Sequence, residues 1–343
     1  MNILVTGGAG FIGSNFIRYM LNKYPDYKIV NLDKLTYAGN LENLRDIENN
    51  PNYNFHKGDI YDQLLVYQLI KLNKIDTIIN FAAETHVDKS NINSVSFLMT
   101  NIFGTINLLE LSKKTGIEKY VQISTDEVYG SIEQSSFDEN SRFNPTSSYS
   151  ASKAAADLLV LKYYKADNIP VIITRSSNNF GPYQYPEKLI PLMITNVLES
   201  KKIPIYGDGK NIRDWIYVED NCEAIDFILH NGKIGEVYNI GANNEKENVW
   251  IAKKVLSLMG KNQDEMENFI EYVKDRPKHD RRYSLNTRKI NELGWKPKND
   301  FESALEKTVN WYVNNHDWWK KIKSGEHFQE WYKMFYVKER GLK

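Results

Sequence analysis

The sequence has almost no cysteine. Cys222 is the single cysteine among 343 residues, which excludes a disulfide within the chain. It also lacks neighbours that could complete a zinc site, and no cluster of cysteine, histidine, aspartate and glutamate has the spacing of metal ligands. We therefore expect no bound metal, and we expect Cys222 to be a small, half-buried residue on a helix.

Net charge and long apolar runs are also missing. The chain carries 44 basic and 44 acidic side chains, so its charge balance favours neither a nucleic acid nor a membrane surface as partner. No apolar run approaches the roughly 20 residues that cross a bilayer. The first expected strand begins at Asn2, which leaves no room for a targeting segment. These features predict a cytoplasmic protein.

What the sequence does contain is an alternation of short apolar runs and longer helical patterns. The runs fall at residues 3–5, 29–32, 77–81, 120–123 and 171–174. This spacing predicts βαβ units, and thus an α/β fold with a Rossmann-like, doubly wound parallel sheet. Beyond Arg175, frequent prolines and glycines indicate the loops and short strands of a smaller C-terminal α/β lobe. We expect domains at 1–175 and 176–343, with about 212–240 rejoining the first.

A glycine-rich loop follows the first expected strand. Gly7, Gly10 and Gly13 stand where a strand gives way to a helix, which is the context that a dinucleotide-binding loop requires. Glycine lets the backbone turn tightly and approach a pyrophosphate at the helix N-terminus. Asp33 follows the second strand, where an acid can bind a ribose 2′-hydroxyl and repel a 2′-phosphate. The first domain is therefore predicted to bind NAD rather than NADP.

Tyr149 and Lys153 are four positions apart at the start of an expected helix, so they share one face. A phenol with a pKa near 10 needs roughly 4 kcal/mol of differential stabilisation to titrate near pH 7. The ammonium of Lys153 and the positive nicotinamide ring can supply it. Tyr149 is thus a candidate base for a hydroxyl proton.

Thr125, Asp126 and Glu127 end the apolar run that begins at Tyr120. A reaction that expels water as well as transferring hydride needs a base for carbon and an acid for the leaving hydroxyl, and two neighbouring carboxylates offer both. The carboxyl group that acts as the acid must then be protonated near neutral pH while the other stays ionised, and burial beside a like charge is the available cause. Because adjacent strand residues point to opposite faces, we expect the backbone to turn at residues 125–127.

With these three motifs, the chain resembles the extended short-chain dehydrogenase/reductase family. Segments at 36–41, 82–88, 125–130 and 208–215 look like those of the dTDP-glucose 4,6-dehydratases within that family. The resemblance runs from the first residue to about residue 312. Its most specific part is the Thr-Asp-Glu triplet, because related sugar-nucleotide epimerases usually lack both carboxylates.

The resemblance implies that the protein dehydrates dTDP-glucose to a 4-keto-6-deoxy sugar for deoxysugar (rhamnose-type) biosynthesis, with NAD tightly bound and recycled. Tyr149 would take the C4 hydroxyl proton as hydride passes to NAD, with Thr125 holding that hydroxyl and Lys153 the nicotinamide ribose. Glu127 would remove the C5 proton, Asp126 would protonate the departing C6 hydroxyl, and hydride would return to C6.

The same resemblance implies which residues bind the ligands. The expected NAD contacts are Gly7, Gly10, Phe11, Ile12, Gly13, Asp33, Lys34, Thr36, Asp59, Ile60, Phe81, Ala82, Ala83, Thr100, Tyr149, Lys153 and Asn179. The expected substrate contacts are Thr85, Thr125, Asn178, Lys188, Leu189, Pro204, Tyr206, Arg213, Asn248, Arg276, His279 and Tyr283.

The basic run at residues 275–283 is expected to clamp a diphosphate together with Arg213, because an arginine fork suits phosphate geometry. One departure is visible in this run, since Lys278 stands where relatives commonly have glycine. His86 and His279 are expected to be hydrogen-bonded neighbours of the site without a proton-transfer role.

Three other functions stay open: a sugar-nucleotide 4-epimerase, a dehydratase of another nucleotide sugar, and a catalytically silent NAD-binding protein. Asp126 and Glu127 disfavour the epimerase. The intact set of Thr125, both carboxylates, Tyr149 and Lys153 disfavours the silent protein.

Two expected helices, around residues 94–115 and 149–165, carry apolar residues on more than one face, so they need a second burial surface. With the family resemblance, this implies a homodimer through a four-helix bundle. The many aromatic residues from Trp311 to Tyr336 are expected to pack against the lobe or a partner chain rather than to line a ligand site.

Overall fold

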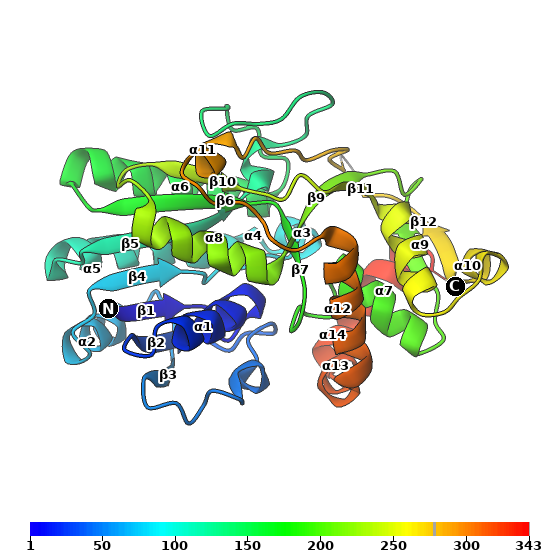
Figure 1. Ribbon diagram of the computed structural model, residues 1–343, viewed down its shortest axis with the longest axis horizontal. Helices are drawn as coiled ribbons and strands as arrows, with labels where there is room; N and C mark the ends of the chain where they lie inside the picture. Colours follow the sequence, from blue (N-terminus) through cyan, green and yellow to red (C-terminus); the bar gives the residue numbers. More distant parts are fainter. Residues whose placement is uncertain (277–278, 343) are drawn as a thin grey trace.

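A parallel sheet of seven strands forms the larger lobe of the computed structural model, on the left in Figure 1. The structure describes residues 1–276 and 279–342. The strand order is β10-β6-β5-β4-β1-β2-β3, so the chain builds one edge of the sheet and then returns past β1 to build the other. This is the predicted doubly wound α/β fold. The strands are β1 (Asn2–Thr6), β2 (Lys28–Asp33), β3 (Tyr53–Lys57), β4 (Thr77–Asn80), β5 (Lys119–Thr125), β6 (Val171–Ser176) and β10 (Val237–Ile240).

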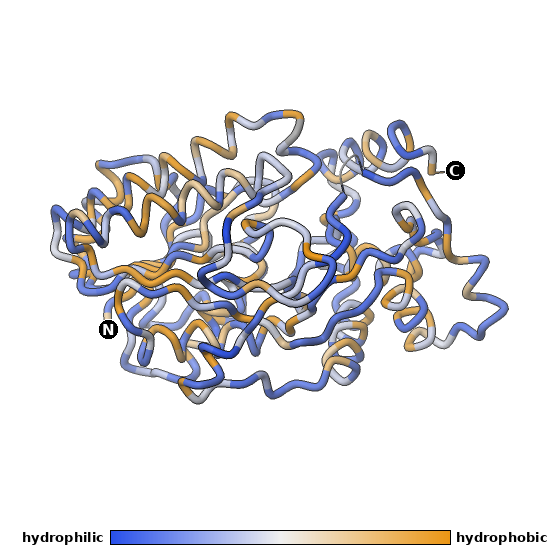
Figure 2. Tube along the Cα trace, turned by 90° about the horizontal axis from the view of Figure 1, so that it is seen from above, coloured by the Kyte–Doolittle hydropathy of each residue, from blue (hydrophilic) through white to orange (hydrophobic). Residues whose placement is uncertain are grey.

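Alternating strand residues bury themselves on opposite faces of this sheet. Ile3 and Val5 of β1 belong to the core beneath α1 and α8, whereas Leu4 belongs to the core beneath α2, α5 and α6. Figure 2 shows the apolar strands running side by side through this lobe. The covering helices are α1 (Phe11–Lys23), α2 (Gln63–Leu72), α5 (Thr105–Thr115), α6 (Ser148–Asp167) and α8 (Val218–Asn231).

The smaller lobe combines short strands with helices (Figure 1). Its core contains Trp215, Phe301, Tyr312 and Trp319. The strands are β7 (Asn178–Phe180), β8 (Ile203–Tyr206), β9 (Ile212–Tyr217), β11 (Glu245–Glu247) and β12 (Ile270–Val273). The helices are α7 (Leu189–Leu198), α9 (Asn248–Leu258), α10 (Gln263–Phe269), α12 (Phe301–Asn314), α13 (His316–Ser324) and α14 (Glu326–Tyr332), followed by the π-helical turn η4 (Lys333–Lys338).

The stretch at 212–240 divides between the two lobes. β10 pairs with β6 in the large sheet, and α8 packs in the same lobe. β9 instead pairs with β7 and β11. Its alternating side chains explain this position, because Ile216 is buried in the core of the large lobe while Trp215 and Tyr217 are buried in the core of the small one.

One buried feature differs in degree from the expectation, and another agrees with it. Cys222 on α8 is fully buried rather than half-buried, because α8 lies against α1 and the sheet. The aromatic tail packs as expected: Trp319 lies in the core of the small lobe, and Trp331 and Phe335 form a further cluster with Leu192 of α7.

One helical stretch, residues 94–115, is long and apolar enough to cross a membrane by length and composition alone. It consists of α4 (Ser94–Phe97), the π-helical turn η2 (Leu98–Gly104) and α5. The sequence expectation missed it because polar residues interrupt the apolar ones. Leu108, Leu109 and Leu111 lie in the core of the large lobe, which accounts for much of the apolar character without a bilayer.

Candidate active site

A cavity of about 320 Å³ lies at the carboxyl ends of the parallel strands. Ligands bind at this edge in open α/β sheets, where the strand order reverses. The cavity is lined by Thr125, Asp126, Glu127, Tyr149 and Lys153 and by every residue predicted to contact NAD. Thr85, Asn178 and Lys188 of the predicted substrate set line it as well.

The glycine loop connects β1 to α1, and its shape excludes side chains. Gly7 has a φ of +70°, and a Cβ there would lie 2.6 Å from the backbone nitrogen of Ala82. A Cβ on Gly13 would lie 2.5 Å from the carbonyl oxygen of Gly7. Helix α1 begins directly after Gly10, so its free amides face the cavity. The loop has the form that a pyrophosphate requires.

Asp33 ends β2 and is held by the backbone. Its Oδ2 accepts a hydrogen bond from the amide of Ala9 at 2.9 Å, and its Oδ1 accepts one from Leu35 at 2.8 Å. Asp33 is buried, and the burial raises its pKa. Nearby, Lys34 forms an ion pair with Asp59 at 2.7 Å. These side chains form the wall of the cavity where the adenosine ribose of a dinucleotide would lie.

The backbone turns at the end of β5, as the sequence predicts. Thr125 is the N-cap of a short 3₁₀ helix, η3 (Asp126–Tyr129), and its hydroxyl accepts a hydrogen bond from the amide of Glu127 at 3.2 Å. The same hydroxyl donates to Oδ1 of Asp126 at 3.2 Å. This turn lets both carboxylates line the cavity, where a straight strand would send them to opposite faces.

The two carboxyl groups differ in their electrostatic surroundings. Burial and the neighbouring charge of Glu127 raise the pKa of Asp126 well above its usual range. Burial also raises the pKa of Glu127, but the positive charges of Arg213, Lys188 and Arg276 oppose that rise. The environments therefore separate the two groups in the direction expected for an acid beside a base.

Tyr149 and Lys153 lie on one face of α6, and both are buried. The sequence analysis expects Lys153 and the nicotinamide ring together to lower the pKa of Tyr149. Among the protein groups alone, burial, followed by the charge of Glu127, raises that pKa. Lys153 instead donates to the carbonyl oxygen of Ile123 on β5 at 2.6 Å, and burial lowers its own pKa to about 8. A cationic ring beside the phenol would have to supply the compensating charge.

Several buried polar atoms of the cavity have no hydrogen-bond partner within the described part of the chain. They include Oδ2 of Asp126, the hydroxyl of Ser124 and the side-chain oxygens of Asn178 and Asn179. Buried polar atoms are normally paired, so their clustering beside the glycine loop indicates a polar ligand. Together with the loop that admits no Cβ and the anchored Asp33, they fit the donor and acceptor set of NAD and a sugar.

The remaining predicted substrate residues lie in the small lobe, outside the lining of this cavity. The guanidinium of Arg213 lies over the ring of Tyr283 at 4.0 Å, and its Nη2 lies 3.3 Å from Nε2 of His279. The guanidinium of Arg276 lies over the ring of Tyr206 at 4.9 Å. Leu189 is the first residue of α7, Pro204 lies in β8, and Asn248 is the first residue of α9. Lys278 lies outside the described residues.

The two predicted neighbouring histidines are held by hydrogen bonds, and His86 is buried while His279 is half-buried. His86 accepts at Nδ1 from the amide of Lys89 at 3.2 Å, and burial lowers its pKa well below the usual range. Burial lowers the pKa of His279 to about 4, although its Nδ1 lies 2.6 Å from Asp275. Neither ring has a geometry that calls for proton transfer to the cavity.

Sequence reasoning missed several residues that line the cavity, and Tyr37, Glu84 and Glu187 are the ionisable ones with the most contacts to one another and to Lys89. The hydroxyl of Tyr37 donates to Oε1 of Glu187 at 2.9 Å, and Lys89 lies 3.5 Å from Oε2 of the same carboxylate. Burial and Glu187 raise the pKa of Tyr37. The only sequence signal was their position beside predicted contacts, Thr36 and Lys188, because Glu187 meets Tyr37 across 150 residues.

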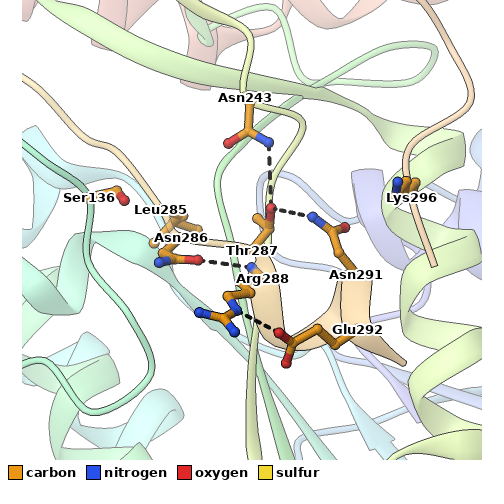
Figure 3. Close-up of a pocket in the computed structure, with 9 residues that line it drawn as sticks. All are labelled: Ser136, Asn243, Leu285, Asn286, Thr287, Arg288, Asn291, Glu292 and Lys296. Atoms are coloured by element: carbon orange, nitrogen blue, oxygen red, sulfur yellow. Dashed lines mark hydrogen bonds and ion pairs between the residues drawn. The ribbon is translucent and has the colours of Figure 1, made fainter. Parts of the chain in front are cut away.

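A second hollow, of about 510 Å³, lies around the short helix α11 (Arg288–Glu292) and contains none of the predicted site residues (Figure 3). Asn243 and Asn291 both donate to Oγ1 of Thr287, and Arg288 bonds Glu292 at 2.5 Å. Within the described residues, no group of three or more histidine, cysteine, aspartate or glutamate side chains could hold a metal ion.

Comparisons with known proteins agree with this site. A family model described as GDP-mannose 4,6 dehydratase matches residues 4–308. The dTDP-glucose 4,6-dehydratase of Haemophilus influenzae is 48% identical over 334 residues, which cover 92% of this chain and 98% of the relative. The dTDP-glucose 4,6-dehydratase of Bacillus anthracis, solved in complex with NAD, is 54% identical with a TM-score of 0.88, covering 94% of this chain and 100% of that one.

A second solved dTDP-glucose 4,6-dehydratase, from Streptomyces venezuelae with NAD and dTDP bound, is 44% identical. It has a TM-score of 0.90 and covers 94% of this chain and 100% of that chain. The family-model match spans more than half of the sequence, and the relatives are similar over nearly their whole length. This chain therefore belongs to the GDP-mannose 4,6 dehydratase family, and several relatives that it matches over nearly their whole length are NAD-dependent dTDP-glucose 4,6-dehydratases.

Proposed function

We propose that the protein converts dTDP-glucose to dTDP-4-keto-6-deoxyglucose and water, as a step of deoxysugar biosynthesis. The observation that carries the proposal is the turn after β5, which brings Asp126 and Glu127 into one cavity with Tyr149 and Lys153. The large lobe would bind NAD through the glycine loop and Asp33, and the small lobe would bind the nucleotide of the sugar.

The proposed chemistry begins at the C4 hydroxyl of the sugar. NAD, when bound, accepts hydride from C4 and returns it to C6. Tyr149 takes the C4 hydroxyl proton, with Thr125 holding that hydroxyl and Lys153 holding the nicotinamide ribose. The resulting C4 ketone acidifies the proton on C5, which Glu127 removes.

Elimination then needs a proton for the leaving group. Asp126 is suited to supply it, because burial and Glu127 favour its neutral form. It protonates the C6 hydroxyl, which leaves as water. Hydride then returns to C6 and Glu127 returns its proton to C5, so the cofactor is regenerated in place. The proton that Tyr149 took from the C4 hydroxyl replaces the one that Asp126 gave up, and the substrate loses one water overall. We accordingly propose that NAD stays bound between turnovers.

The small lobe would hold the diphosphate and the base. Arg213 and Arg276 present guanidinium groups beside Tyr283 and Tyr206, and their charges reach Glu127. Two arginine forks suit the two phosphates of a nucleotide sugar. The preference for thymine over uracil rests on the similarity to the dTDP-glucose enzymes.

We further propose that the partner is a second copy of the chain and that the protein works in the cytoplasm, where its charged, water-soluble ligands are found. A band of large apolar side chains is exposed on the helical stretch 94–115 and on α6. It includes Val95 at 64%, Phe103 at 47% and Leu158 at 59% exposure. Such a band is typical of an interface between subunits. Light scattering that shows a monomer at working concentration would contradict the dimer.

The deciding experiment incubates the purified protein with dTDP-glucose, adds no NAD, and follows the product mass. Loss of one water is expected, with UDP-glucose and GDP-mannose as controls for base preference. A product of unchanged mass but altered C4 configuration would instead identify a 4-epimerase. No conversion, even after NAD is supplied, would favour a silent NAD-binding protein.

A further inference from the structure

The end of the chain contacts the loop and helix that border the active-site cavity. We use the name C-terminal segment for residues 326–342, which comprise α14, η4 and the four residues that follow. Helix α3 (Val87–Ile92) begins directly after the cavity-lining Glu84 and Thr85. The family-model match ends at residue 308, so the C-terminal segment lies beyond it.

Aromatic and polar contacts join the two regions. The ring of His86 lies 5.6 Å from that of Trp331 and 5.8 Å from that of Phe335. Nζ of Lys89 lies 3.3 Å from Nε2 of His327, whose ring stacks on Tyr37 at 4.7 Å. The first turn of α3 is therefore packed between the cavity and the C-terminal segment.

An ion-pair triad completes the contact. Asp88 is 7% exposed, and it accepts two hydrogen bonds from Arg276, at 2.9 Å from Nε and 2.7 Å from Nη2. Its Oδ1 also accepts from Nη2 of Arg340 at 2.9 Å. Arg340 is 8% exposed and lies 252 residues away in the sequence. Both guanidinium groups lie over the ring of Tyr206, at 4.9 Å and 4.6 Å.

The charges of this triad do not cancel. Two guanidinium groups share one buried carboxylate, Asp88. A second carboxylate, Glu339, lies 3.3 Å from Nη1 of Arg340, but its side chain is 47% exposed, so water weakens that pair. If Arg340 were absent, Asp88 would neutralise Arg276 completely, and a bidentate pair of that kind holds its arginine firmly. Arg340 thus keeps part of the charge of Arg276 available to an anion.

We propose that Arg340 is a positioning residue for the diphosphate of the substrate, acting through Asp88 on Arg276. This role rests on the proposed function, in which Arg276 belongs to the diphosphate clamp. The C-terminal segment then has a part in substrate affinity, although it supplies no group to the reacting carbons. Loss of Arg340 is therefore expected to weaken phosphate binding and to leave the rate of the chemical step unchanged.

The test compares ligand binding by the intact, NAD-loaded protein and by an Arg340→Met variant. Calorimetry with dTDP should show a loss of affinity of roughly tenfold, which corresponds to one modest charge interaction. Binding of thymidine, which has no phosphate, should be unchanged. In turnover assays, KM for dTDP-glucose should rise by a similar factor while kcat stays the same, and Arg340→Lys should restore part of the affinity.

A matched control is Lys338→Met, which removes the same charge from an exposed position in the same segment. It should leave both affinities near those of the unmodified protein. Equal loss of thymidine and dTDP affinity in Arg340→Met would overturn the proposal, because it would mean that the segment only supports the fold of the site. An unchanged dTDP affinity in that variant would overturn it as well, while the proposed dehydration would stand. Failure of the unmodified protein to bind either dTDP or UDP would overturn the clamp and this role together.

Discussion

Two pairs of charged groups near β5 are built in opposite ways. Asp157 on α6 is fully buried beside Arg175 of β6, whose Nε donates to it at 2.8 Å. Asp126 is 3% exposed, and its nearest charged neighbour is another carboxylate, Glu127. Asp157 is paired with a cation, whereas Asp126 lies beside another carboxylate.

The difference separates a structural site from a chemical one. A buried carboxylate with a cation stays ionised and joins elements of the fold, here α6 and β6. A buried carboxylate beside a like charge is unstable as an ion, so it holds a proton that it can give away. The rest of the fold has to stabilise this arrangement, and in the proposed reaction Asp126 would then be an acid that works near neutral pH.

The strongest test of this contrast is Glu127→Gln, which should lower kcat by a factor on the order of 10³, because the C5 proton loses its base. The free energy of unfolding should stay the same or increase, because a like charge beside Asp126 is removed. Stopped assays of product mass and urea unfolding measure the two effects. A variant that keeps normal turnover would remove Glu127 from the chemistry.

On the structural side, Asp157→Asn should lower the free energy of unfolding by about 3 kcal/mol, because Arg175 is left buried without its carboxylate. The double variant Asp157→Asn, Arg175→Met should recover much of the loss, since neither charge then lies unpaired. Urea unfolding of the single and double variants gives the coupling between the two residues. If the changes in unfolding free energy caused by the two substitutions simply add, Asp157 and Arg175 are not energetically coupled.

Replacing Asp126 should change the stability in the opposite direction from replacing Asp157. Asp126→Asn should reduce kcat by on the order of 10²-fold, because the leaving hydroxyl loses its acid. A raised carboxyl pKa stabilises the folded state below the ordinary aspartate range, and this stability is lost as the pH rises through the folded-state pKa. The unmodified protein should therefore lose stability with rising pH above about pH 4, and the variant should lose less of it. Parallel unfolding slopes for both proteins from pH 5 to pH 8 would contradict the raised pKa.

The smallest effect is expected at an exposed pair. Arg288 and Glu292 on α11 are 80% and 62% exposed, so Arg288→Ala should leave the unfolding midpoint and kcat almost unchanged (Figure 3). This variant measures how much an exposed ion pair contributes to stability, for comparison with the buried pair of Asp157 and Arg175. A clear loss of stability here would mean that the buried position of Asp157 explains less than we propose.

Local patterns in the sequence predicted most of the large lobe. Strands such as Ile3–Val5 and the glycine loop are set by residues that are close in sequence, so periodicity and backbone freedom were enough. The turn at Thr125 followed from the need to bring two adjacent carboxylates to one cavity. The position of β9 did not follow, because its alternating side chains serve two cores at once.

Long-range contacts account for what the sequence did not predict. Glu187 contacts Tyr37 across 150 residues, and Arg340 contacts Asp88 across 252 residues. No local sequence pattern predicts such contacts. The raised pKa of Tyr149 was missed for a related reason. Spacing placed Lys153 on the same helix face, but only the fold shows that its ammonium is bonded to Ile123 of β5.

The meeting of Asp88 with Arg340 also has a consequence for how the protein is made. The cofactor loop and Asp33 are present once β2 has been synthesised, and the large sheet is complete when β10 ends at residue 240. The triad beside Tyr206 has to wait for residue 340. During synthesis on the ribosome, the nascent chain therefore contains its dinucleotide loop long before the triad of Asp88, Arg276 and Arg340 can form. A chain that stops early would keep the loop and lack the triad.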